Sequence, residues 1–420
     1  MIPPTQHASP LRALTHRNFA LFFTGHGISL CGTWMQTMAQ AWLVYRLTGS
    51  PFLLGLAEFL TRAPILLFGL AGGLVADRWP RHRLLFVTQS LLLVQAGSLA
   101  ALTLSGTVTV RWILGLALVL GLISALDHPV RQAFLTDLVP RRDIPSAIGL
   151  NSSIFNASRL IGPTLAGLLV GAVGEGACFL VNALSFLVIL GCLTAMRVKQ
   201  TVRSTQSNAI GLLTEGLAYV QRTRHVLALI VLVSVLGVAS MPFSTLLPVF
   251  AGAVLHTGPN GLGLLMGATG IGALSAALRL ARRGTVVGLV PSIAAAAGLF
   301  GGGLLVLAAS SIPWVSLAAL VAIGFGMVSC MAGTNTMLQS QAPEALRGRV
   351  ASLYSTVSLG STIFGSLLAG TGATYYGAPL TVAAGGLITL LAAAVFWMTQ
   401  RDISVRVVEG PLPSLEEVVK

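Results

Sequence analysis

Charged residues are scarce in this chain, and acidic residues are the scarcest. Asp, Glu, Lys and Arg together make up 9% of the 420 residues, whereas an ordinary soluble domain carries about 25%. Hydrophobic residues reach 55%. So little charge leaves too few polar groups to cover a soluble globule, so the composition excludes a water-soluble fold.

Cysteine and catalytic motifs are also nearly missing. The four cysteines lie in apolar segments without disulfide or metal-ligand spacing, and we interpret them as packing residues: Cys31, Cys178, Cys192 and Cys330. The sequence has no HExxH motif, no paired histidine motif and no phosphate-binding Gly-Lys-Ser/Thr loop. We therefore expect no enzymatic activity, no cofactor, no metal site and no direct use of ATP.

Long apolar runs fill most of the chain. A helix needs about 20 apolar residues to cross the hydrocarbon core, and backbone amides in lipid must bond within the helix. The sequence predicts an all-α membrane protein with twelve spans: 19–45, 52–76, 83–104, 111–133, 146–170, 176–196, 225–254, 259–280, 287–310, 313–340, 349–374 and 379–399.

Basic residues mark one face of the predicted membrane protein. With the amino terminus inside, Arg46 and Arg111 are the only Lys or Arg facing outside, while Arg62 and Arg159 lie within spans. This positive-inside bias predicts that both termini are cytoplasmic, in the inner membrane of a bacterium. The net charge of +13 is scattered beside apolar runs rather than along a soluble face, so we expect no nucleic-acid partner.

A weak internal repeat divides the chain into two halves. We expect a cytoplasmic segment at 1–18, a six-helix bundle at 19–196, a linker at 197–224, a second bundle at 225–399 and a tail at 400–420. A shift of 203 residues places Gly162 on Gly365 and Gly167 on Gly370. A parallel repeat of this kind is typical of transporters whose substrate site lies between two rocking bundles.

Residues 73–83 read GLVADRWPRHR between the second and third spans. The stretch resembles the cytoplasmic signature of the major facilitator superfamily. The resemblance implies a conformational latch, and we include Arg131 of the fourth span in it; the latch residues are Gly73, Asp77, Arg78, Arg81, Arg83 and Arg131. Charge-assisted pairs of this kind can break and reform. An ordinary positive-inside loop is the alternative.

Small residues around a Gly-Pro pair characterise the fifth span: Gly149, Ser158, Gly162, Pro163 and Gly167. They resemble the antiporter signature of the same superfamily, which implies a helix bend and export against a proton gradient. Ordinary close helix packing is the alternative. Residues 128–140, HPVRQAFLTDLVP, resemble the branch that contains enterobactin exporters, macrolide efflux proteins and lysophospholipid transporters.

Ionisable residues within spans are costly and therefore candidates for function. Glu58 and Arg62 lie four residues apart on one helix face, and Asp127 and Arg131 repeat that spacing. Glu58, and then Asp127, are candidates for proton coupling; a permanent ion pair with the neighbouring arginine is the alternative for each. Arg159 has no sequence-local partner, so it binds an anionic substrate group or pairs with Glu58.

The second half has apolar and polarisable residues in place of these charges. Candidates for lining a substrate cavity there are Met241, Phe243, Met327, Met331 and Asn335. In the first span Trp34, Gln36 and Gln40 are further candidates, together with Arg62 and Arg159. Packing against neighbouring helices is the alternative for each of the apolar side chains.

These features predict a secondary exporter of amphipathic small molecules, drug-like or siderophore-like, that works by alternating access with proton antiport. A proton-independent flippase or facilitator for a lysophospholipid or other lipid-like substrate is the second hypothesis. The expected partners are a small-molecule substrate, protons and membrane lipid, and we expect a monomer.

Overall fold

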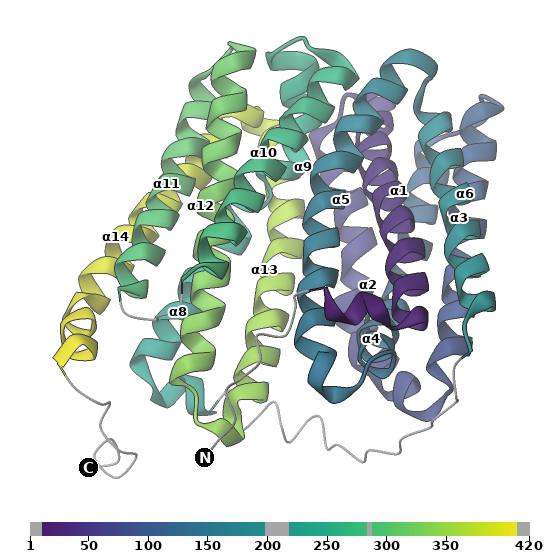
Figure 1. The fold of residues 1–420 in the computed structure, drawn as a ribbon. Helices are drawn as coiled ribbons and strands as arrows, with labels where there is room; N and C mark the ends of the chain where they lie inside the picture. Colours follow the sequence, from purple (N-terminus) through teal and green to yellow (C-terminus); the bar gives the residue numbers. More distant parts are fainter. Residues whose placement is uncertain (1–10, 198–217, 284–287, 410–420) are drawn as a thin grey trace. The chain divides into compact units, whose positions relative to one another are not determined.

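The computed structural model describes the backbone of residues 11–197, 218–283 and 288–409, and within these ranges every regular element is a helix (Figure 1). The first half contains η1 (Arg12–Thr15), α1 (Arg17–Thr48), α2 (Pro51–Arg78), α3 (Arg81–Leu104), α4 (Val110–Asp137), η2 (Arg141–Asp143), α5 (Ile144–Val173) and α6 (Glu175–Ala195). The second half contains α8 (Arg224–Ala239), α9 (Phe243–Val249), η3 (Phe250–Val254), α10 (Gly258–Ala281), α11 (Leu289–Ala309), α12 (Pro313–Gln341), η4 (Glu344–Leu346), α13 (Arg347–Tyr376) and α14 (Ala378–Glu409).

The helices correspond in order to the predicted spans. Ten candidate spans in the described residues are long and apolar enough to cross a membrane, with α8, α9 and η3 counted together as one. The helices α1 and α13 are as long but carry more polar residues, and they fall on the predicted spans 19–45 and 349–374. The prediction of an all-α membrane fold is confirmed.

Local sequence explains where these helices begin and end. Gly49 ends α1 in the left-handed conformation at φ 61°, which a residue with a side chain rarely adopts. Ser50 then caps α2, since its hydroxyl accepts a hydrogen bond from the amide of Leu53 at 3.4 Å, and Pro51 occupies the first turn. The turn between α1 and α2 therefore needs only two residues.

The predicted span 225–254 is interrupted. Helix α8 ends at Ala239, a turn follows through Pro242, and α9 leads into the π-helical turn η3. Pro242 has no amide hydrogen to continue the helical bonding. The hydroxyl of Ser240 donates to the carbonyl of Gly385 at 3.2 Å and contacts Thr389, so these side-chain contacts attach the break to α14.

Contacts divide the chain into two compact units. Unit 1 contains Met1–Ser207, Ser244–Gly270 and Ser366–Tyr375, and unit 2 contains Asn208–Phe243, Ile271–Gly365 and Tyr376–Lys420. In unit 1 the helices α1 to α6 pack on one another, and in unit 2 α11 packs on α12 and α14, with α8 beside them. Two segments of the second half thus belong to the unit formed mainly by the first.

Three of the predicted regions fall largely outside the described residues, namely 1–18, 197–224 and 400–420. Where they are described, η1 and the start of α1 occupy 12–18, and α14 continues to Glu409. The predicted division into bundles at 19–196 and 225–399 stays a prediction.

The core of unit 1 is apolar and closely packed near the ends of α3 and α4. The ring of Phe134 meets Phe22 edge-on with centroids 5.6 Å apart, and Phe19 is fully buried. On the other side of α1, Gly32 lies so close to α6 that a Cβ there would stand 2.7 Å from the Asn182 Oδ1. The absence of a side chain lets the two helices approach, which holds α1 rigidly beside the polar groups described next.

Candidate functional site

Glu58 and Arg62 form an ion pair within one turn of α2. The Arg62 Nε donates to the Glu58 Oε1, as their i, i+4 spacing predicts. The Glu58 side chain is 27% exposed and the Arg62 side chain 39% exposed. Among the described residues, Arg62 is the one hydrogen-bond or ion-pair partner of Glu58. Both side chains are partly exposed.

Asp127 in α4 is held much more tightly. Its Oδ1 accepts hydrogen bonds from the Thr88 hydroxyl at 2.7 Å and from the Gln89 amide at 2.8 Å, both on α3. Its Oδ2 lies 3.5 Å from a guanidinium nitrogen of Arg131, and the side chain is 4% exposed. Three partners on a buried carboxylate stabilise its charged form. The geometry favours the permanent structural pair for Asp127.

Two histidines extend this group. His128 accepts at Nδ1 from Arg131 at 3.0 Å. His26 of α1 stacks on Phe22 with ring centroids 5.3 Å apart and lies close enough to Asp127 and Arg131 to interact electrostatically. His26 of α1 therefore lies in one group with Asp127, His128 and Arg131 of α4 inside unit 1.

Arg159 of α5 stands apart from these pairs. It is half-buried, and in the part of the chain that the structure describes its side chain has neither a hydrogen-bond nor an ion-pair partner. Its electrostatic neighbour is Arg62, a like charge. The alternative of a direct Arg159–Glu58 pair is not formed in this structure, because the carboxylate of Glu58 bonds Arg62. The alternative in which Arg159 binds an anionic substrate group stays a prediction.

The glutamines of the first span differ in their surroundings. Gln36 donates to the Oε1 of Gln95 at 3.1 Å and accepts from the amide of Asn182 at 2.8 Å, linking α1 to α3 and α6. Its side chain is committed to this buried network. Gln40 is also buried, but it has no side-chain hydrogen-bond partner among the described residues. Trp34 is half-buried and meets Phe155 of α5 edge-on at 5.8 Å.

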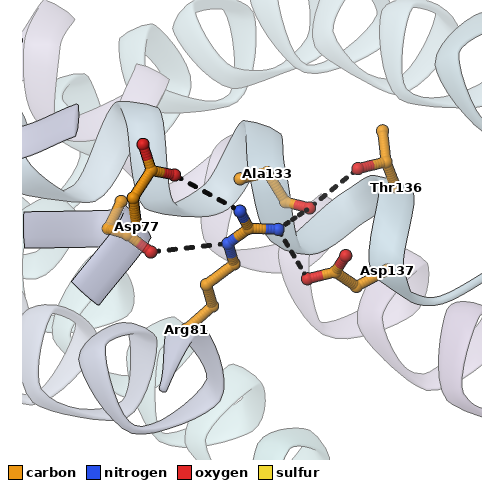
Figure 2. A network of polar contacts seen from close by, with 6 residues as sticks. Asp77, Arg81, Ala133, Thr136 and Asp137 are labelled. Atoms are coloured by element: carbon orange, nitrogen blue, oxygen red, sulfur yellow. Dashed lines mark hydrogen bonds and ion pairs between the residues drawn. The ribbon is translucent and has the colours of Figure 1, made fainter. Parts of the chain in front are cut away.

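Arg81 is the centre of the predicted latch (Figure 2). Its guanidinium lies 3.5 Å from the Asp77 carboxylate and 2.8 Å from the carboxylate of Asp137 at the end of α4. It also donates to the carbonyl of Ala133 at 3.5 Å. Arg81 thus joins the ends of α2 and α4 at the start of α3.

The other predicted latch residues do not share this contact. Arg131 pairs instead with Asp127, which lies nearly three helical turns before Asp137 on α4. Arg78 and Arg83 are exposed and have no side-chain partner among the described residues, and a Cβ at Gly73 would meet nothing within 4 Å.

The Gly-Pro segment of α5 makes two close helix contacts. A Cβ on Gly162 would stand 2.6 Å from the Trp34 Cβ of α1. A Cβ on Gly167 would stand 2.9 Å from the Cα of Gly263 in α10. Ser158 and Pro163 are buried beside them, whereas Gly149 faces open space. The Gly-Pro segment therefore packs closely against α1 on one side and against α10 on the other.

The second-half candidates lie in unit 2 and are neutral. Phe243 is buried and meets Phe300 edge-on at 6.1 Å, and Met327 is buried. The carbonyl of Met331 accepts from the Tyr354 hydroxyl at 2.8 Å. The side chain of Asn335 accepts from Gln339 at 3.0 Å on the exposed side of α12.

Met241 is half-buried in the turn between α8 and α9, beside Pro242. Among the described residues no group of three or more His, Cys, Asp or Glu side chains is arranged to hold a metal ion.

Comparison with known proteins identifies the family. A family model described as a transmembrane secretion effector of the major facilitator type matches residues 8–409. The chain belongs to the major facilitator superfamily. It is 26% identical over 391 residues to the staphyloferrin A transporter of Staphylococcus aureus, covering 93% of this chain and 98% of the relative. It is 24% identical to the multidrug efflux pump Tap of Mycobacterium tuberculosis, over 93% of this chain and 92% of the pump.

Solved structures agree on the fold. A bacterial homologue of the human lysosomal transporter Spinster, in an inward-facing and occupied conformation, matches with a TM-score of 0.73 at 13% identity. The match covers 94% of this chain and 98% of that structure. This superfamily member is accordingly a multi-pass membrane transport protein, as its sequence predicts.

The structure of this transporter adds charged residues that the sequence patterns did not single out. Asp137 is a second carboxylate partner of Arg81, and its signal in the sequence is its place at the carboxyl end of α4. Asp143 pairs with Arg12 at 3.3 Å and with His16 at 2.8 Å, which docks η1 on the start of α5.

A third missed pair lies at the opposite end of α1. Arg46 donates to both carboxylate oxygens of Glu175, at 2.7 and 3.2 Å. Glu175 stands in the first turn of α6, where the helix dipole favours an acid. In the sequence, the ion pairs of Asp137, Asp143 and Glu175 are indicated only by the position of each acid at a helix terminus.

Proposed function

We propose that this transporter is a secondary exporter of amphipathic small molecules that works by alternating access. The observation that carries the proposal is a pair of glycine contacts in unit 1 that are repeat counterparts of each other. Gly55 of α2 meets Gly370 of α13, and Gly167 of α5 meets Gly263 of α10. The repeat shift of 203 residues converts Gly167 into Gly370, and a shift of 208 converts Gly55 into Gly263.

Each contact joins a helix of the first half to a helix of the second. A Cβ on Gly55 would stand 2.5 Å from the carbonyl oxygen of Ser366, and a Cβ on Gly370 would stand 2.7 Å from that of Pro51. Backbones that touch without interlocking side chains can part without breaking a side-chain network. Two such contacts, related by the repeat, fit a gate that opens when the halves rock.

Proton antiport is assigned to Glu58. A coupling carboxylate must gain and lose a proton within the transport cycle. It therefore needs few fixed partners and an exposed side chain that protons can reach. Glu58 has one partner, Arg62, and an exposed fraction of 27%. Asp127 has three partners and is buried. Glu58 is therefore the better coupling candidate, and Asp127 holds α3 against α4.

The substrate carries an acidic group together with apolar surface. Arg159 supplies a positive charge that has no partner among the described residues. Trp34 and Gln40 of α1 belong to the same unit as Arg159. Staphyloferrin A is the cargo named for one relative, and several drugs are implied by the name of another. Both names support a small-molecule cargo for this chain.

The transporter acts as a monomer in a bacterial inner membrane, with both termini in the cytoplasm. The positive-inside distribution supports this orientation, since Arg78, Arg141 and Arg282 lie at ends of helices that it places on the cytoplasmic side. Arg81 of the predicted latch belongs to the same cytoplasmic loop region as Arg78.

Transport by the full chain in proteoliposomes, with and without an imposed pH gradient, tests the proposal. We expect the gradient to drive export by the wild type, and Glu58→Gln to remove that drive while substrate binding is retained. Glu344→Gln, at an exposed position in η4 of unit 2, is the matched control and should stay coupled. Export that ignores the gradient would instead indicate a facilitator or flippase, and a screen with lysophospholipids would then identify lipid-like cargo.

A further inference from the structure

A cavity in unit 2 lies between the end of α10 and the start of α11, and it encloses about 300 Å³. Three arginines line it with two serines and three apolar side chains; the lining residues are Ala276, Arg279, Leu280, Arg282, Arg283, Leu289, Ser292 and Ser329. None of the residues predicted to bind cargo or protons belongs to this set.

The residues that line this cavity include no Asp or Glu to balance the three arginines. Among the described side chains of unit 2, Glu344 is the single Asp or Glu, and it does not line the cavity. In unit 1, by contrast, Arg81, Arg62 and Arg46 each pair with a carboxylate. The side chains of Arg279, Arg282, Ser292 and Ser329 have no hydrogen-bond or ion-pair partner among the described residues.

Arg279 and Arg283 lie near the amino terminus of α11, the end at which the helix dipole is positive. The guanidinium of Arg279 lies 5.7 Å from the ring centroid of Phe325, a contact that fixes its direction. A Cβ on Gly288 would stand 3.3 Å from an Arg283 Nη2, so Arg283 reaches the residue that precedes α11. The first turn of α11 contains no acidic residue, and its cap makes no side-chain hydrogen bond. Three cations at a helix amino terminus repel one another unless an anion joins them.

We propose that this cavity binds a phosphate ester, supplied by the headgroup of an anionic phospholipid. Planar guanidinium groups and serine hydroxyls match the oxygens of a phosphate, as do free amides at a helix amino terminus. The apolar Ala276, Leu280 and Leu289 suit the glycerol and first methylenes of a lipid. Helix ends that carry several arginines at a membrane surface attract anionic lipids.

Native mass spectrometry of the full chain, after addition of phosphatidylglycerol or of phosphatidylcholine, tests the proposal. We expect one phosphatidylglycerol to be retained by the wild type, and its affinity to fall by roughly 100-fold in R279Q/R282Q/R283Q, at about fivefold per arginine. The control R222Q/R224Q/R347Q removes the same charge from exposed positions outside the cavity and should retain the lipid.

A second arm distinguishes the sources of phosphate. Thermal unfolding of wild type and both variants in lipid-free detergent, with and without inorganic phosphate or glycerol 1-phosphate, reports a soluble ligand and shows that each variant folds. Stabilisation of the wild type by soluble phosphate without lipid retention would keep the phosphate site and overturn the lipid. Equal lipid retention and equal phosphate response in the wild type and R279Q/R282Q/R283Q would overturn the proposal.

Discussion

The guanidinium of Arg81 lies 2.8 Å from the carboxylate of Asp137, and this contact ties the start of α3 to the end of α4 (Figure 2). Asp77, the acid within the motif itself, lies farther away at 3.5 Å. The acid nearest to Arg81 therefore comes from α4, outside the 73–83 motif that contains Arg81.

Breaking this contact should slow transport without unfolding the protein. We expect Asp137→Asn to lower the export rate about fivefold, and Asp77→Asn to lower it less, because a partly exposed ion pair contributes up to about 1 kcal/mol. Export rates of Asp137→Asn, Arg81→Gln and the double variant measure the coupling. Full additivity of the two single losses would show that the two side chains act independently.

A large side chain at Gly370 should keep α13 from packing closely on α2. We expect Gly370→Leu to stop export while substrate binding persists, because even a Cβ would stand 2.7 Å from the carbonyl of Pro51. Labelling of Asn260→Cys by a membrane-impermeant thiol reagent on intact cells should increase in the Gly370→Leu background. Gly69→Leu is the control, since a Cβ there meets nothing within 4 Å; unchanged labelling in Gly370→Leu would contradict the gate.

We expect substitution of Asp127 to affect the stability of the protein, and substitution of Glu58 to affect proton coupling. Asp127→Asn removes a buried carboxylate that pairs with the half-buried Arg131, so we expect it to lower the free energy of unfolding by roughly 2–5 kcal/mol. Glu58→Gln should change stability by much less, because Glu58 is partly exposed and has one partner. Thermal unfolding of the purified proteins in detergent measures this difference, and equal losses would argue against the separation.

Arg159 should select for acidic cargo. We expect Arg159→Gln to weaken the binding of anionic substrates by about 10- to 100-fold, because a hydrogen bond to a charged group contributes roughly 1.5–3 kcal/mol. The affinity for neutral analogues should stay within about threefold of wild type. Binding of matched acid and ester forms of one compound makes the comparison, with Arg159→Lys expected to recover part of the affinity. The same loss for both forms would assign Arg159 to packing.

Several local features of this transporter could be predicted from the sequence because they depend on neighbours within one helix. The Glu58–Arg62 and Asp127–Arg131 pairs follow from i, i+4 spacing alone. The break near Pro242 could have been expected from the missing amide hydrogen, but the support that Ser240 gains from α14 depends on a residue 145 positions away.

The functions of single polar residues were harder to predict. Gln36 could line a cavity or join a network, and only the position of Asn182 on α6 shows that it joins one. Arg131 could complete the latch or pair within α4, and the structure shows the pair within α4. Sequence spacing does not report the rotation of one helix against another, and that rotation decides what a side chain meets.

The sequence by itself determined that the chain crosses the membrane as helices, because the bilayer offers backbone amides no partner outside the helix. It also determined the superfamily and the concentration of intramembrane charge in the first half. Tertiary structure alone decided that Asp137 partners Arg81, that Asp127 has three partners while Arg159 has none among the described residues, and that Arg279, Arg282 and Arg283 line one cavity beside the start of α11. Those outcomes depend on contacts between helices that are distant along the chain, which the apolar pattern of each helix does not specify.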